Sequence, residues 1–124
     1  MARFRDQPHT RARGRLGEEQ GVRWLEGRGY RILERNFSCR SGELDVIAEQ
    51  GGVLCFVEIK ARGDRSFGSA IEAIHAAKKR RIARAAAHYL ARHPTEKPCR
   101  FDVLAMDLED GEWRYTLVAD AFSL

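Results

Sequence analysis

The sequence predicts an α/β domain in which a mixed five-stranded sheet is flanked by helices, with the element order αβββαββ. Three extended runs, a long amphipathic helical pattern and two further extended runs follow one another along the chain. A helix that crosses between two strands commonly joins parallel neighbours, so the sheet should be mixed. With 124 residues, the chain is long enough to bury its own core and to form one domain.

The first half of the chain should form an arm, a helix and three strands. Residues 1–13 hold four Arg without apolar periodicity, which indicates a flexible basic arm before a single domain at 14–124. A helix is expected at 14–29, with Val22 and Leu25 on its buried face. Strands are expected at 30–38, 43–50 and 53–60. Only Gly51 and Gly52 separate the last two, which is typical of a type I′ hairpin turn because both positions need positive φ.

The second half should form the crossover helix and a second hairpin. Residues 62–69 are polar and Gly-rich and indicate a loop. A helix is expected at 70–92, and strands at 100–108 and 112–119 around a turn at 109–111. The inward stripe of the helix is expected to comprise Ile71, Ile74, Lys78, Ile82, Ala85 and Tyr89.

Composition limits the classes of protein. The 22 Lys and Arg against 18 Asp and Glu give a net charge of +4, and the basic residues cluster, which favours a polyanion partner. The three cysteines are odd in number and show no CxxC spacing, which argues against both a disulfide framework and a zinc finger. No apolar stretch approaches the length of a membrane span, and the N-terminus has no apolar signal region. We therefore expect a cytoplasmic protein without a membrane partner.

Charged residues interrupt the apolar runs of the second and third strands. If the glycine turn sets the register, Asp45 faces Glu58, and Glu43 faces Lys60. Directly paired residues project from the same face with Cβ atoms about 5 Å apart. The two carboxylates should therefore meet, with Lys60 two residues further along the same strand. A slip by one residue would send one carboxylate to the opposite face.

A carboxylate pair needs compensation. Two like charges at about 5 Å repel by about 3 kcal/mol at an effective dielectric of 20, so a cation or a shared proton should lie between Asp45 and Glu58. Oxygen-only ligands suit Mg²⁺ or Mn²⁺ better than zinc. Such an ion activates water and neutralises phosphoryl charge, while Lys60 orients the nucleophile or stabilises the developing anion. This combination is the chemistry of phosphodiester hydrolysis.

Two more charged residues lie on inward helical stripes, where burial alone would favour Leu or Ile. Glu18 on the first helix and Lys78 on the long helix could each reach the carboxylates. Alternatively, each could extend to solvent with its stem on the core, and an ExK pattern alone is usually a surface ion pair. Asp102 also interrupts an apolar strand, either as a structural acceptor or as part of the site. His75, His88 and His93 lack metal-ligand spacing and should be surface residues.

The long helix carries a basic run that covers more than one side. Its members are Lys78, Lys79, Arg80, Arg81 and Arg84. A solvated helix face is the default explanation, and a phosphodiester site nearby would make these residues candidates for nucleic-acid backbone contacts.

These motifs resemble a known pattern. Asp45 followed by Glu58-Ile59-Lys60 is similar to the PD-(D/E)XK nuclease superfamily, although Leu44 stands where the superfamily name has Pro. More narrowly, the sequence resembles the bacterial YraN-like family, in which an Ala is usual at the position of Gly21. The resemblance spans about residues 14–122 and is carried by GRLGE at 14–18, WLEGRGYRILERN at 24–36, GELDVIA at 42–48, FVEIKAR at 56–62, FGSAIEAI at 67–74, Lys78 and RFDV at 100–103.

The resemblance implies a three-layer, restriction-endonuclease-like core similar to archaeal Holliday junction resolvases. It implies that Asp45, Glu58, the Ile59 carbonyl and Glu18 hold the metal, and that Lys60 is the catalytic lysine. Lys78 would match the lysine on the family's long helix. A two-fold dimer would suit a junction with two scissile strands.

Together these features lead us to expect a Mg²⁺- or Mn²⁺-dependent endonuclease acting on DNA, with branched DNA as one candidate substrate. The alternative is a non-catalytic nucleic-acid-binding or assembly module that keeps the nuclease fold. A third reading is an interaction protein in which Lys60 and Lys78 only neutralise the acidic residues.

Overall fold

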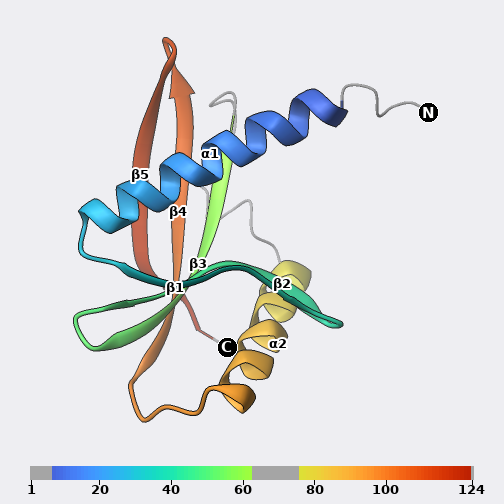
Figure 1. Cartoon of the computed structure of the whole chain (residues 1–124), viewed down its shortest axis with the longest axis vertical. Helices are drawn as coiled ribbons and strands as arrows, with labels where there is room; N and C mark the ends of the chain where they lie inside the picture. Colours follow the sequence, from blue (N-terminus) through green and yellow to red (C-terminus); the bar gives the residue numbers. More distant parts are fainter. Residues whose placement is uncertain (1–6, 63–75, 124) are drawn as a thin grey trace.

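Five strands form one mixed sheet with the order β1–β2–β3–β4–β5 in the computed structural model, which describes residues 7–62 and 76–123 (Figure 1). Strands β3 and β4 are parallel, and the other neighbours are antiparallel. The predicted order αβββαββ is confirmed. The elements are α1 (Gln7–Gly27), β1 (Arg31–Cys39), β2 (Gly42–Gln50), β3 (Val53–Arg62), α2 (Ala76–Arg92), β4 (Cys99–Glu109) and β5 (Glu112–Phe122).

The two helices cover opposite faces of the sheet and create two cores. Val22 and Leu25 of α1 belong to one buried cluster with Val57 and Ile59 of β3. The second cluster, on the other face, comprises Phe37, Leu44, Ile47, Leu54, Phe56, Ile82, Ala85, Ala86, Tyr89, Val103 and Ala105. The layers are therefore helix, sheet and helix, as expected for a restriction-endonuclease-like core.

Two helix boundaries differ from the prediction or extend past the described residues. Helix α1 begins at Gln7 rather than at residue 14. The prediction placed the start too late because it depended on apolar periodicity, which residues 7–13 lack. Residues 70–75, with which the predicted helix α2 began and which include Ile71, Ile74 and His75, lie outside the described residues. Of the remaining stripe, Ile82, Ala85 and Tyr89 are buried.

The hairpin register follows from its turn. Gly51 and Gly52 have φ of 58° and 82°, as a type I′ turn requires. The pairing runs from Gln50 opposite Val53 to Val46 opposite Val57, which confirms the predicted register. From Val46 to Ala48 and from Leu54 to Val57 the side chains alternate between the two clusters, as a period of two requires, whereas Leu44 lies in the cluster of α2 although it is two residues from Val46.

Asp102 is a structural acceptor, which decides between the two roles left open by the sequence. It is 1% exposed and accepts a hydrogen bond from Tyr30 Oη at 2.8 Å. Its other oxygen accepts bonds from Arg100 Nε at 2.8 Å and from the backbone N–H of Asp120 at 2.9 Å. The register shift in β4–β5 and the positive φ of Asp120 bring that amide to the carboxylate. Within the described residues, no buried polar side-chain atom lacks a hydrogen-bond partner.

The cysteines and the helices can be compared with the expectations about disulfide bonds and membrane spans. Cys39, Cys55 and Cys99 are all free thiols. Neither α1 nor α2, as far as they are described, combines the length and the apolar character needed to cross a bilayer.

Candidate functional site

The site lies where β2 leaves β3. The backbone pairing of the two strands ends at Val46 opposite Val57, and the strands then diverge (Figure 1). Beyond this point a side chain replaces the backbone as hydrogen-bond acceptor. Oδ2 of Asp45 accepts a hydrogen bond of 2.7 Å from the backbone N–H of Ile59. The carboxylate therefore occupies the gap between the strands, anchored to the strand that carries Glu58.

Asp45 and Glu58 meet on the α2 side of the sheet. The side chain of Glu58 is 7% exposed, and its Oε2 lies 2.9 Å from Nζ of Lys78 on α2. The carboxyl groups of Asp45 and Glu58 lie within hydrogen-bonding range of each other, and Asp45 also feels the charge of Lys78. The convergence of the two carboxylates, inferred from the turn and the strand period, is thus present in the structure.

Burial and repulsion disfavour the ionised pair. Burial first, and then the charge of Glu58, raise the pKa of Asp45 to about 7, although the N–H of Ile59 and Lys78 act in the opposite direction. Burial lowers the pKa of Lys78, but its hydrogen bond to Glu58 and the charges of Glu58 and Asp45 together outweigh this effect and leave the pKa raised. Lys78 therefore stays charged and compensates one carboxylate of the two.

Glu18 approaches Asp45 from α1. Its side chain is half-buried, and burial followed by the charge of Asp45 raises its pKa. A hydrogen bond with the side chain of Asn36 partly offsets this rise. Glu18 thus points inward, as its place on the helical stripe predicted.

Asn36 is a residue of the site that the sequence analysis missed. On β1 it lies between the pairs Arg35 with Val46 and Phe37 with Leu44, and so opposite Asp45. Its φ is 53°, a left-handed conformation that Asn tolerates better than most residues. An Asn inside a strand was the available signal, because Asn is otherwise depleted from strands.

Lys60 and Glu43 do not form the predicted pair. The β2–β3 pairing ends before it reaches them, and Glu43 is exposed and pairs with Ser38 of β1 instead. The twist that separates the strands is the physical reason. Lys60 is half-buried opposite Ala105 of β4, and it has no ion-pair partner among the described residues.

The predicted basic run is not one uniform face. Lys78 is engaged with Glu58, and Nζ of Lys79 lies 5.4 Å from the centre of the Phe122 ring. Arg80, Arg81 and Arg84 are exposed. His88 and His93 are exposed as well, in agreement with the expectation of surface residues.

The donor set fits a hard divalent cation through two carboxylates. No group of three or more His, Cys, Asp or Glu close enough to hold a metal occurs in the described part of the chain, so Glu18 does not complete a three-residue ligand set here. Mg²⁺, however, is commonly held by one or two carboxylates and keeps several waters. A strand residue directs its N–H and C=O to the same neighbouring strand, so the Ile59 carbonyl shares the side on which its amide meets Asp45.

The raised pKa of Asp45 predicts that the metal-free protein loses stability as the pH rises. For a raised folded-state pKa, the contribution is complete below the unfolded-state value near 4 and is lost as the pH rises through about 7. Between pH 4.5 and 8 in EDTA, we expect the free energy of unfolding to fall by about 2 kcal/mol more in the wild type than in Asp45→Asn. Urea denaturation across this range measures the difference, and equal pH profiles would contradict it.

Comparisons with known proteins identify the relatives of this chain. The model of "Uncharacterised protein family UPF0102" matches residues 17–106. A UPF0102 protein of Symbiobacterium thermophilum is 49% identical over 115 residues, which cover 91% of this chain and 98% of that protein. A UPF0102 protein of Alcanivorax borkumensis is 46% identical over 96 residues, covering 76% of this chain and 77% of that protein. One of Ralstonia pickettii is 42% identical over 123 residues, covering 95% of each.

Proposed function

The chain belongs to the UPF0102 family, the YraN-like family of the PD-(D/E)XK superfamily, and on this premise we propose that it is a metal-dependent endonuclease of DNA in the cytoplasm. Mg²⁺ or Mn²⁺ is the proposed cofactor. Branched DNA is one candidate substrate, for which a homodimer would present two sites.

One observation carries the proposal: two acidic side chains from diverging strands meet in a largely buried position. The charge of Glu58 and a hydrogen bond with it act on Asp45, and among the described residues Lys78 is the lysine that compensates them. A fold selected only for stability gains nothing from such a pair, since two carboxylates that share a site disfavour each other's ionisation. A site that must attract a divalent cation needs this arrangement.

Each residue has a proposed task. Asp45 and Glu58 supply charged oxygens, and the Ile59 carbonyl and Glu18 border the same gap. When bound, the ion would supply an activated water and neutralise phosphoryl charge. Lys60, unpaired among the described residues, is the group proposed to orient the nucleophile or to stabilise the developing anion.

Calorimetric titration of Mn²⁺ into the EDTA-stripped protein tests the cation site directly. We expect saturable binding that Asp45→Asn weakens at least about tenfold. Asp110→Asn is the matched control, because it makes the same charge change in the exposed β4–β5 turn and should leave the titration unchanged. Equal Mn²⁺ affinity in wild type and Asp45→Asn would refute the site.

A non-catalytic nucleic-acid-binding module is the second candidate. The ion pair of Lys78 with Glu58 favours it, because that pair neutralises half of the site without a metal. This candidate predicts DNA binding by the exposed arginines of α2 that is salt-sensitive and indifferent to both Mn²⁺ and Asp45→Asn. In the metal-dependent nuclease, by contrast, Mn²⁺ and Asp45 matter.

A further inference from the structure

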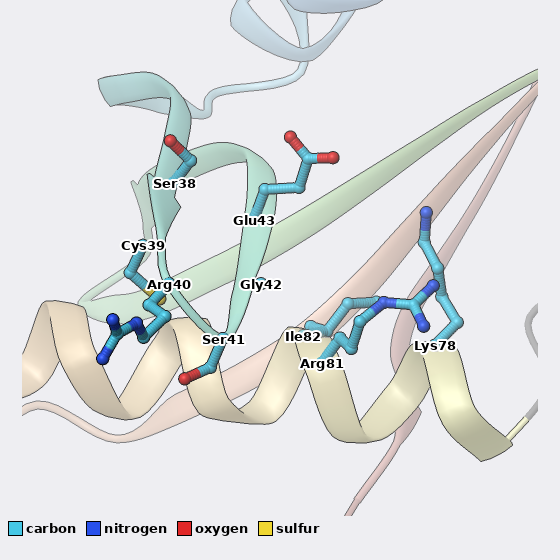
Figure 2. A pocket seen from close by; sticks show the side chains of 9 residues that line it. All are labelled: Ser38, Cys39, Arg40, Ser41, Gly42, Glu43, Lys78, Arg81 and Ile82. Carbon is cyan, nitrogen blue, oxygen red and sulfur yellow. The ribbon is translucent and has the colours of Figure 1, made fainter.

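A polar pocket of about 280 Å³ lies between the β1–β2 turn and α2 (Figure 2). Its lining comes from two elements that are distant in the sequence. The lining residues are Ser38, Cys39, Arg40, Ser41, Gly42, Glu43, Lys78, Arg81 and Ile82. The volume is slightly below that of pockets for drug-sized ligands, so a small group fits it best.

The walls of the pocket are held together by a close backbone contact. A Cβ atom added to Gly42 would lie 2.3 Å from the carbonyl oxygen of Arg81, which is far inside van der Waals contact. Only glycine allows the turn to rest directly on the backbone of α2. The positions of Ser41 and Arg81 relative to each other are therefore set by the fold rather than by flexible side chains.

The pocket is positively charged. Three cationic side chains, Arg40, Lys78 and Arg81, line it against the single carboxylate of Glu43. In Figure 2 the side chains of Lys78 and Arg81 extend to the same side of α2, whereas Glu43 points away from the helix and Arg40 projects beyond the other end of the turn. Among the described residues, Arg40 and Arg81 have no ion-pair partner. An anion beside Lys78 would satisfy the guanidinium of Arg81, which extends to the same side of α2.

The pocket adjoins the carboxylate site. Lys78 belongs to both: it lines the pocket, and its Nζ lies 2.9 Å from Oε2 of Glu58. Glu43, at the pocket edge, is two residues from Asp45 on the same strand and raises the pKa of Glu18 through its charge. A chain that passes the carboxylate pair would therefore enter the pocket next.

We propose that this pocket binds a backbone phosphate of the nucleic-acid strand, adjacent to the phosphate at the Asp45–Glu58 site. This inference rests on the proposed function, since it supplies the substrate contact for the same site. Arg81 forms the charged, fork-shaped contact, beside Lys78 on the same side of α2. Arg40, at the other end of the β1–β2 turn, is placed to contact the nucleic-acid strand beyond the pocket. Because phosphates carry no base information, the pocket positions the strand without reading its sequence.

Fluorescence anisotropy with labelled single-stranded and duplex oligodeoxynucleotides, in EDTA, tests the pocket without any catalysis. We expect Arg81→Gln to weaken binding about tenfold across sequences and to lower the salt slope by about one. The matched control is Arg92→Gln, the same charge change about 16 Å further along α2. It should weaken binding less than twofold. Both residues are exposed, so both variants should fold.

Each outcome decides something. Equal losses in Arg81→Gln and Arg92→Gln, or a wild type that does not bind DNA, would overturn the pocket. Inorganic phosphate and a mononucleotide serve as competitors: if either bound the wild type more tightly than the oligonucleotide, the pocket would serve a free anion instead. DNA binding that depends on Arg81 in a protein that never cleaves DNA would refute the nuclease alone and leave the phosphate pocket standing.

Discussion

Replacing Glu58 with Gln should reduce metal-dependent DNA cleavage at least about 100-fold while the protein stays folded. The amide keeps the size of the side chain and an oxygen that can accept a hydrogen bond from Lys78, now 2.9 Å from Oε2. It loses the negative charge that the proposed cation needs. It also removes the like charge that disfavours ionised Asp45, so we expect the free energy of unfolding in EDTA to change by no more than about 1 kcal/mol.

The assay compares initial rates on linear, single-stranded and four-way-junction DNA with Mg²⁺ and with Mn²⁺. Glu49→Gln is the matched control. Glu49 lies near the end of β2 that is distant from Asp45, and it forms ion pairs with Arg31 and Lys97. The substitution should cost stability at most slightly and leave the rate within about twofold. Full activity in Glu58→Gln, or equal losses in both variants, would show that the carboxylate pair is not the reacting centre.

The part of the site set by local chemistry was predictable from the sequence. Two glycines in a two-residue turn fix the hairpin register as far as Val46 opposite Val57, which leaves Asp45 and Glu58 at the next position of each strand. The point where β2 leaves β3 was not predictable, because it depends on sheet twist and on packing against α2. For this reason the pairing of Glu43 with Lys60 was wrong, and the bond from Ile59 to Asp45 was not foreseen.

Contacts between distant segments were also hidden. In the sequence Gly42 looks like an ordinary turn residue. Its close approach to the backbone carbonyl of Arg81 is evident only in the structure. Asn36 adopts a left-handed conformation at the edge of the site, and no spacing rule relates it to Glu18. Such features follow from the approach of α1 and α2 to the sheet, which a single sequence does not specify at this level of detail.

Asp45 and Asp102 illustrate what the sequence could not separate. Both are aspartates inside apolar strands, and both are expensive to bury. The structure distinguishes them by their neighbours. Asp102 accepts bonds from Tyr30, Arg100 and Asp120, whereas Asp45 accepts one from a backbone amide and faces another carboxylate. The first arrangement stabilises the charge, and the second leaves it in need of a cation.

Asp102→Ala should therefore destabilise the protein by about 3–5 kcal/mol. The alanine would leave the Arg100 guanidinium, whose side chain is 21% exposed, without its carboxylate, and the Tyr30 hydroxyl and the Asp120 amide without their acceptor. Tyr30→Phe removes a single donor of the same network and should cost about 1 kcal/mol. Urea denaturation at pH 7 measures both, and a loss below 1 kcal/mol for Asp102→Ala would contradict the structural role.

The same variant separates stability from function. Asp102 is paired with Val57, which packs under α1, whereas Glu58 faces α2, so the network and the carboxylate pair lie on opposite faces of the sheet. At a low temperature where Asp102→Ala is still folded, its Mn²⁺ titration should match that of the wild type within about threefold. A selective loss of Mn²⁺ binding in the folded variant would instead place Asp102 within the site, because lost stability alone leaves the affinity of folded molecules unchanged.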